Sequence, residues 1–353
     1  MGARSGNNYL SSLRKLKADL WLDGERVADP TIHPALVRRA RAIASLYDLQ
    51  MEHPAAMTWR LDDGDRAGLS FIQPHSVEEV QRRGVMFRRW AEAHGGTLEW
   101  TPDYCNTALA ALTAASKVVA ARAPQFAANL EAYYREARQR DWCAAITLPD
   151  PISAASETYT DSQALALTEQ TPEGIVVEGR RNVAPFAPFA EELLVVPPPR
   201  STELVTASAL AFAINCNARG LKLLCRTGAD CVAVFDRVLI PSARIFLQGD
   251  VTAGDALLEQ TSVVVNLMHQ RAVNAAVTAE LRLGLAARIA RDAVGFPQVR
   301  ERLATMSIAV DLIRSCLHAA ENVAHEDRPG HFIPARSALD AVHSLVTRLY
   351  PVS

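Results

Sequence analysis

The chain has 353 residues, an apolar content of 49% and a formal net charge of -2, values typical of a globular protein with two or three compact units. The near-neutral charge argues against a nucleic-acid or anionic-membrane surface, which requires an excess of Lys and Arg. No stretch reaches the roughly 18 consecutive apolar residues of a spanning helix, and the basic N-terminus lacks the apolar segment of a secretory signal. We therefore expect a cytoplasmic protein that binds neither nucleic acid nor membrane.

The first third of the chain predicts mainly helices. Helices are expected over Leu10–Trp21, Ala35–Gln50, Val77–Gly95, Asp103–Ala123 and Pro124–Arg140. Ser76 with Glu79 three positions later is a capping-box pattern, and Gly95-Gly96 would end the same helix. An Asp-Gly turn lies within Trp21–Val27. These segments predict an N-terminal helical domain over residues 1–138.

Residues 139–250 predict a β-domain, because short apolar runs alternate with turn residues as in an antiparallel sandwich or barrel. The expected strands are Ala144–Leu148, Ala164–Glu169, Ile175–Val177, Leu193–Val196, Ala209–Ile214, Leu221–Cys225 and Cys231–Phe235. Arg180–Glu192 carries two prolines and two phenylalanines, which leave little room for a regular strand. Pro197–Thr206 predicts a loop that could cover a site.

Residues 251–353 predict a helical bundle. Asp255–Val294 is apolar nearly all round, which favours one long central helix. A heptad seam follows, with Val299, Leu303, Met306, Val310, Ile313, Leu317 and Ala320 at alternating spacings of four and three. Leu339–Leu349 predicts a last helix. The fold class is therefore α+β, with helices, a small antiparallel β-domain and a bundle in that order.

The six cysteines are scattered and form no CxxC pair. Several lie inside apolar runs, which favours buried, reduced thiols over a disulfide framework or a structural metal. His318, His325 and His331 lie near Glu326 and Asp327, but their spacing matches no helical ligand pair. This stretch therefore predicts a solvated helix end, and no metal is expected.

Several segments carry a resemblance to a known family. They include Trp21–Ala35, Thr101–Asn106, Gly174–Pro197, Arg219–Arg226 and Cys231–Val251. They resemble the 4-hydroxyphenylacetate 3-hydroxylase family, the oxygenase component of two-component, flavin-dependent phenol hydroxylases with an acyl-CoA dehydrogenase-like fold. The resemblance implies this fold for a divergent, C-terminally shortened member.

The positions to which the resemblance assigns phenol and flavin contacts differ in this chain. A motif like GRSPDYxN reads EWTPDYCN, so Tyr104 is retained while Trp100 stands at the arginine. Ile146 stands at a histidine, and Pro185 at a flavin-binding threonine. Asp150–Ala155 lacks the polar residues of a second flavin motif. We therefore expect no cofactor, with FAD or reduced FAD as the possible alternative.

With Trp100 and Ile146 in place of the arginine and the histidine, the polar groups that would hold a phenol are replaced by apolar side chains, which disfavours the phenol hydroxylation of the family. An apolar wall could still accelerate a reaction by holding a flexible substrate folded. Tyr104 and Asp103 are the candidate catalytic donor and acceptor. The candidate substrate-binding residues are Trp100, Tyr104, Ile146, Pro185, Phe186 and His269.

The leading hypothesis is a redox-neutral biosynthetic enzyme, a cyclase or isomerase acting on an apolar small molecule. One alternative is an FAD-dependent, two-component monooxygenase that tailors a natural product, and another is a non-catalytic scaffold or partner subunit. Asp103 could instead cap its helix, and His269 could be a hydrogen-bonded core or interface residue. Because members of the family associate through the C-terminal bundle, the resemblance also implies a homodimer.

Overall fold

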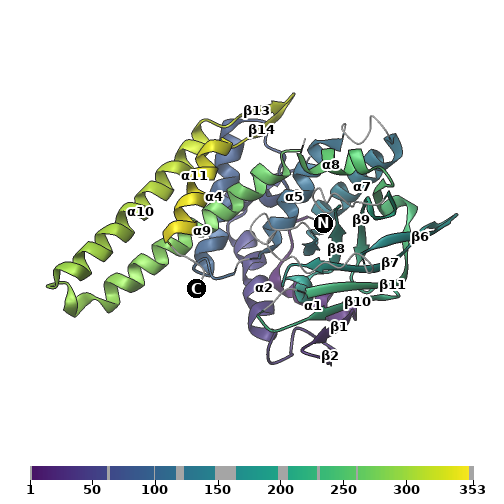
Figure 1. Cartoon of the computed structure of the whole chain (residues 1–353), viewed down its shortest axis with the longest axis horizontal. Helices are drawn as coiled ribbons and strands as arrows, with labels where there is room; N and C mark the ends of the chain where they lie inside the picture. Colours follow the sequence, from purple (N-terminus) through teal and green to yellow (C-terminus); the bar gives the residue numbers. More distant parts are fainter. Residues whose placement is uncertain are drawn as a thin grey trace. The chain divides into compact units, whose positions relative to one another are not determined.

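The computed structural model describes residues 2–61, 64–98, 100–116, 123–147, 164–197, 206–228, 231–259 and 261–349 (Figure 1). Contacts divide the chain into two compact units. The first unit comprises Met1–Pro54, Thr58–Phe71 and Trp100–Thr261, and the second comprises Ala55–Met57, Ile72–Glu99 and Ser262–Ser353. The boundaries of the three predicted domains stay a prediction.

The first unit holds a two-sheet β-structure together with helices from both ends of its sequence. Its helices are α1 (Gly6–Leu16), α2 (Val37–Glu52), α5 (Pro102–Ala114), α7 (Pro124–Arg140) and α8 (Val251–Glu259), while α3 (Pro54–Met57) lies at the boundary of the units in the sequence. Ser5 caps α1 by accepting a hydrogen bond from the backbone of Asn8, and Lys17 ends it with φ 55°. The predicted helix Leu10–Trp21 was therefore wrong at its C-terminal end, where the burial alternates as in a strand.

Two sheets form the β-structure. The larger has the order β2-β1-β10-β11-β7-β6, and the smaller has the order β12-β9-β8-β5. Their strands are β1 (Asp19–Leu22), β2 (Glu25–Val27), β5 (Ala144–Ile146), β6 (Ala166–Thr171), β7 (Gly174–Val183), β8 (Glu192–Val195), β9 (Leu210–Asn215), β10 (Leu221–Cys225), β11 (Cys231–Pro241) and β12 (Ile245–Gln248). Neighbours are antiparallel except for β1–β10 and β5–β8. A separate hairpin joins β3 (Thr58–Arg60) to β4 (Arg66–Gly68).

The β-domain is confirmed and is mainly antiparallel, and two details of the prediction are corrected. β7 continues through Arg180 to Val183, because its far end pairs with β11 and still buries alternate side chains. The predicted Asp-Gly turn is confirmed, and it joins β1 to β2 in a hairpin that extends the larger sheet. Cys225 and Cys231, expected as free thiols, are paired as a disulfide across the β10–β11 hairpin.

Parts of three predicted segments lie outside the described residues. They are the end of the helix expected to reach Ala123, the flavin-motif segment Asp150–Ala155 with Leu148 before it, and most of the loop Pro197–Thr206. Among described residues, α5 ends at Ala114.

The second unit is a helical bundle with one small hairpin. Its helices are α4 (Val77–Ala93), α9 (Val263–Ile289), α10 (Pro297–Asn322) and α11 (Arg336–Leu349), and its hairpin joins β13 (His325–Arg328) to β14 (His331–Ile333). Ser76 caps α4 by accepting from the backbone of Glu79, as the capping box predicted. The predicted seam is confirmed in its C-terminal part, where Val310, Ile313, Leu317 and Ala320 are buried together with Ala309 beside them. Its first three residues, Val299, Leu303 and Met306, are half-buried.

Two predictions for the C-terminal region were wrong. The single helix Asp255–Val294 is two helices, α8 and α9, and α9 begins at Val263 and ends at Ile289. The expected solvated helix end is instead the β13–β14 hairpin, which contains His325 and His331. Among the residues that the structure describes, no three His, Cys, Asp or Glu side chains are arranged to hold a metal ion.

Candidate substrate recess and its support

A recess in the first unit gathers four of the predicted substrate-binding residues. Its described lining consists of Trp100, Thr101, Tyr104, Cys105, Ala144, Ala145, Ile146, Ala184 and Phe186. Between the described side chains the recess leaves room for about one water molecule, far less than the typical ligand pocket. It is an apolar recess that the described side chains nearly fill.

The start of α5 and the short strand β5 form two walls of the recess. Pro102 occupies the favoured first position of α5, which leaves Trp100 and Thr101 in the preceding extended segment and Tyr104 in the first turn. The Trp100 and Tyr104 rings meet edge to face with centroids 4.6 Å apart, an arrangement that aromatic pairs favour. Ile146 ends β5, and both Ile146 and Tyr104 are buried.

Cys105 also lines the recess. Its thiol donates to the backbone carbonyl of Ala145 at 3.8 Å. Burial raises the pKa of the Cys105 thiol, so this side chain is a neutral, weakly polar part of the wall.

The remaining predicted site residues are placed elsewhere. Asp103 is buried in the first turn of α5, where a negative charge suits the helix dipole, and it is not among the lining residues. Pro185 is half-buried in the turn after β7; its neighbours Ala184 and Phe186 line the recess, but Pro185 does not. The functional roles of Asp103 and Pro185 stay predictions.

His269 belongs to the second unit. It is fully buried on α9, and its Nε2 lies 2.8 Å from a carboxylate oxygen of Glu321 on α10. Burial lowers the pKa of His269 despite the hydrogen bond to Glu321, and the positive charge of Arg83 lowers it further. This environment is that of a neutral histidine joining two helices, and its role as a substrate ligand stays a prediction.

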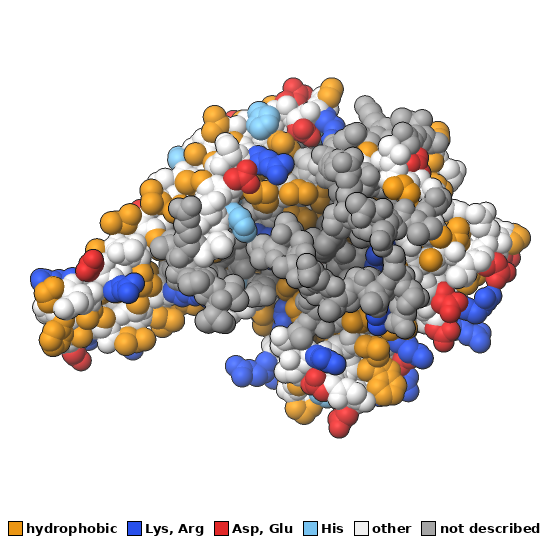
Figure 2. Space-filling model, in the orientation of Figure 1, with side chains coloured by type: hydrophobic (Ala, Val, Ile, Leu, Met, Phe, Trp, Pro, Cys, Tyr) orange, Lys and Arg blue, Asp and Glu red, His pale blue; other side chains and the backbone are white. Residues whose placement is uncertain are grey.

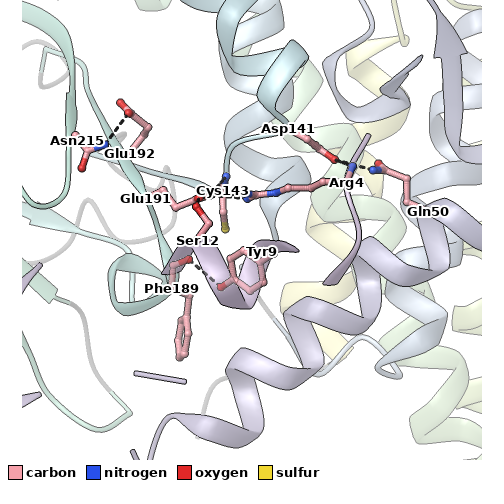
Figure 3. A network of polar contacts seen from close by, with 10 residues as sticks. All are labelled: Arg4, Tyr9, Ser12, Gln50, Asp141, Cys143, Phe189, Glu191, Glu192 and Asn215. Atoms are coloured by element: carbon pink, nitrogen blue, oxygen red, sulfur yellow. Dashed lines mark hydrogen bonds and ion pairs between the residues drawn. The ribbon is translucent and has the colours of Figure 1, made fainter. Parts of the chain in front are cut away.

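A buried polar network that the sequence reasoning missed holds the strand of the recess in place (Figure 3). Both carboxylate oxygens of Glu191 accept hydrogen bonds from the Arg4 guanidinium, and Oε2 also accepts from the backbone N–H of Cys143 at 3.0 Å. Asp141 accepts from the backbone N–H of Arg4 at 3.2 Å and from the Gln50 amide at 2.8 Å. Cys143 directly precedes β5, so this network fixes the position from which β5 begins.

Glu192, the next residue, holds the neighbouring strand. It lies opposite Ala144 in the β5–β8 ladder, and its fully buried side chain accepts from Arg244 at 2.9 Å and from Asn215 at 3.3 Å. Burial raises the pKa of Glu192 to about 7, although Arg244 acts in the opposite direction. The sequence signal for both networks was the Glu191-Glu192 pair at the start of an apolar strand, because buried carboxylates require partners.

The fold defines the class of protein: an α+β chain with an acyl-CoA dehydrogenase-like arrangement and an apolar recess beside its β-structure. Residues 5–230 match the family described as 4-hydroxyphenylacetate 3-hydroxylase N terminal, and residues 255–352 match 4-hydroxyphenylacetate 3-hydroxylase C terminal. The chain belongs to the 4-hydroxyphenylacetate 3-hydroxylase family.

Relatives in this family are oxygenase components. The chain is 32% identical to the 4-hydroxyphenylacetate 3-monooxygenase oxygenase component of Thermus thermophilus, over 99% of this chain and 77% of the relative. It is also 28% identical, over 80% of this chain and 58% of the relative, to a Streptomyces globisporus monooxygenase that acts on a carrier-bound 3-amino-3-(3-chloro-4-hydroxyphenyl)propanoyl group. The family thus includes biosynthetic tailoring enzymes.

Solved structures agree. An oxygenase component of 4-hydroxyphenylacetate 3-monooxygenase complexed with FAD and 4-hydroxyphenylacetate superimposes with a TM-score of 0.89 at 31% identity, covering 99% of this chain and 78% of that one. An archaeal 4-hydroxybutyryl-CoA dehydratase, at 18% identity and a TM-score of 0.84 over 98% of this chain and 74% of that one, shares the fold.

The described residues do not reproduce the flavin contact that the resemblance implied at Pro185. Proline has neither a side-chain hydroxyl nor a backbone N–H to offer a flavin, and Pro185 does not line the recess. Any flavin in this chain must be held by other residues.

Proposed function

We propose that this chain is the oxygenase component of a flavin-dependent, two-component monooxygenase that modifies a small molecule in biosynthesis. Family membership over nearly the whole chain, together with relatives named as oxygenase components, carries the proposal. The expectation of a cyclase or isomerase finds no support among these relatives. FAD or reduced FAD is the cofactor proposed, and a reductase that supplies it is the partner proposed.

The recess is the proposed substrate site. Its walls would exclude water from the bound molecule, and Tyr104 would offer its hydroxyl to a polar group of the substrate. No step through a flavin is assigned to residues of this chain, because Pro185 lacks the contact expected there.

Oxygen incorporation tests this function. The protein is supplied with reduced FAD by a flavin reductase, with NADH and ¹⁸O₂, and a panel of small phenols is analysed by mass spectrometry. The proposal expects one ¹⁸O atom in the product of at least one phenol. Product formation that proceeds equally without flavin and without oxygen would contradict it.

A redox-neutral reaction remains the second candidate, and one observation favours it. Trp100 and Ile146, at the positions of the family's arginine and histidine, both line the recess, so the described wall carries no cation or imidazole. A product isomeric with its substrate, formed without flavin, would identify this alternative. A non-catalytic scaffold is the third candidate, and it is favoured by the small free volume that Trp100, Ile146 and Phe186 leave in the recess.

The second unit supports a homodimer. α9 and α10 expose a surface of apolar side chains (Figure 2) that includes Leu281, Leu285, Ile289, Ile308 and Leu312. Among described residues, α10 has the length and mean hydropathy, 1.3 over one window, of a possible membrane span, and 28% of that window is buried. Charged residues such as Asp311 and Arg314 interrupt it and would be costly in hydrocarbon. We therefore propose that this surface, here named the α9–α10 apolar surface, packs against a second copy.

A further inference from the structure

Cys225 and Cys231 face each other at one end of the larger sheet. The β10–β11 register pairs Leu224 with Val232, so the next facing positions are the two cysteines, whose Cα atoms lie 4.2 Å apart. Both point to the buried side of their strands, with Cys225 5% and Cys231 1% exposed. Because the strand pairing directs the two side chains toward each other, their sulfur atoms can bond without rearrangement of the sheet.

The other four cysteines are free thiols. Three of them, Cys105, Cys143 and Cys216, are buried, and burial raises the pKa of each thiol. A protonated thiol is a poor nucleophile toward an oxidant. Cys316 is half-buried on α10. Among the described cysteines, Cys225 and Cys231 are therefore the two that the fold brings into bonding contact.

The end of the sheet that carries this pair is also held by hydrogen bonds. Asp23, in the β1–β2 turn, donates its backbone N–H to the carbonyl of Cys225 at 3.0 Å. The Asp23 carboxylate accepts from the backbone N–H of Thr227 at 3.1 Å and from its hydroxyl at 2.6 Å. A separation of six residues closes only a short loop, and short loops gain the least from a cross-link. We therefore expect the fold to persist when the disulfide is reduced.

The pair is connected to the recess through β7. Cys231 lies opposite Val183, the last residue of β7, and Ala184 and Phe186, which line the recess, follow directly in the chain. The ends of strands open more readily than their interiors. A bond from Cys231 to Cys225 restrains the start of β11 and, through it, the residue of β7 that leads into the recess.

We propose that Cys225 and Cys231 form a reversible redox site whose oxidant is hydrogen peroxide, and that the disulfide state restrains residues Val183–Phe186. One thiol takes an oxygen atom from the peroxide and becomes a sulfenic acid, and the first water leaves. The second thiol attacks this sulfur, so that the S–S bond forms and a second water leaves. The pair gives up two electrons and two protons. Reduced glutathione reverses the oxidation by exchange and is itself oxidised to its disulfide.

Differential alkylation of the native protein tests the redox site. The protein is equilibrated with reduced and oxidised glutathione in graded ratios, or treated with hydrogen peroxide, and free thiols are then blocked. Trypsin cleaves after Lys222, Arg226 and Arg237, which places Cys225 and Cys231 on different peptides, 223–226 and 227–237. We expect these peptides to be linked after peroxide or in oxidised glutathione, and both to be alkylated in a large excess of reduced glutathione.

Two results would overturn the reversible site. Peptides that stay unlinked in peroxide would show that the thiols do not join, and a link that survives a large excess of reduced glutathione would show a permanent disulfide. Cys225→Ser should abolish the link, with Cys231→Ser as the second variant if circular dichroism shows that the first does not fold. Cys316→Ser is the control and should leave the link unchanged.

Hydrogen exchange, followed by mass spectrometry in both redox states, tests the restraint on Val183–Phe186. We expect several-fold slower exchange in this segment after oxidation, and no change on peroxide treatment of Cys225→Ser. Equal exchange in the two states of the native protein, or the same slowing in the variant, would overturn the restraint. Because these measurements require neither flavin nor turnover, their outcome is independent of whether the chain is a monooxygenase.

Discussion

At the scale of single residues, Glu191 joins the start of the chain to the strand of the recess. Its carboxylate is the counter-charge of the buried Arg4 guanidinium and also accepts from Ser12 and from the backbone of Cys143. Although burial opposes it, the surrounding groups Tyr47, Glu191 and Asp141 raise the pKa of Arg4, so the guanidinium stays charged.

Glu191→Gln should therefore lower the free energy of unfolding by about 3–5 kcal/mol, because it leaves a buried cation without its anion. The control is Glu169→Gln, which breaks an exposed pair with Arg237 and should cost less than about 1 kcal/mol. Urea unfolding compares the two. Similar midpoints for both variants would contradict the assigned importance of the Glu191 network.

Glu192 predicts a pH dependence of stability. Burial raises the pKa of Glu192 from its ordinary value of 4.5 to about 7, so the folded chain binds this proton more tightly than the unfolded chain. The contribution of the protonated group is fully present below pH 4.5 and is lost as the pH rises through about 7. Glu192→Gln mimics the protonated form and removes this dependence.

The free energy of unfolding of Glu192→Gln minus that of the native chain should therefore be larger at about pH 8 than at about pH 5. Other titrating groups are common to both proteins and cancel in the difference. The measurement is urea unfolding of both proteins at the two pH values. A difference that is the same at both would show that Glu192 does not titrate in this window.

At the scale of elements, the turn after α4 requires glycine for two reasons. Gly96 has φ 68°, and a Cβ there would lie 2.8 Å from the backbone nitrogen of Thr278 on α9. Gly24, in the β1–β2 turn, has φ 88° but open space around its Cβ position. Substitutions at Gly24 and Gly96 therefore distinguish the cost of backbone strain alone from the cost of strain combined with a steric clash.

Gly24→Ala should cost about 1–2 kcal/mol, the cost of a left-handed residue with a Cβ. Gly96→Ala should cost clearly more, because it adds a clash with backbone that cannot move away. Thermal unfolding of the two variants measures both effects. Equal losses would mean that α9 does not approach this turn closely.

The elements that were predictable are those whose signals are local. The capping box at Ser76 and the proline that starts α7 each appear in the structure where the sequence placed them. Elements that depend on partners distant in the sequence were harder to predict. β1 was taken as the end of a helix because its parallel partner, β10, lies about 200 residues further along the chain.

The recess, too, could be predicted only in part. Its lining includes four of the predicted substrate-binding residues, Trp100, Tyr104, Ile146 and Phe186, while their roles stay predictions. The networks behind that wall were not predicted, because Arg4, Asp141 and Glu191 are brought together only by the packing of α1 against the β-structure.

At the scale of the whole molecule, the α9–α10 apolar surface predicts self-association. The native chain should sediment at twice its mass of 38.4 kDa. Ile308→Glu combined with Leu312→Glu places two charges on this surface and should shift the protein to the monomer. Ile32→Glu is the control, because Ile32 is an exposed isoleucine of the first unit, and it should leave the dimer intact. A native monomer would contradict the dimer proposal.

The overall class of the molecule was predictable because the order of helices, β-domain and bundle is visible in composition and periodicity. The reaction was harder to predict from the sequence. Replacements at Trp100 and Ile146 pointed to a redox-neutral enzyme, whereas relatives across nearly the whole chain favour an oxygenase. A few altered residues describe a substrate wall more securely than they describe a reaction.

Anaerobic titration with reduced FAD, followed by titration with oxidised FAD, tests the central claim that this chain is a flavin-dependent oxygenase component. We expect saturable binding of reduced FAD by the native protein, with contacts other than Pro185, so that Pro185→Ala changes the affinity little. Absence of binding in both oxidation states at high flavin concentration would contradict the oxygenase and leave the redox-neutral alternative.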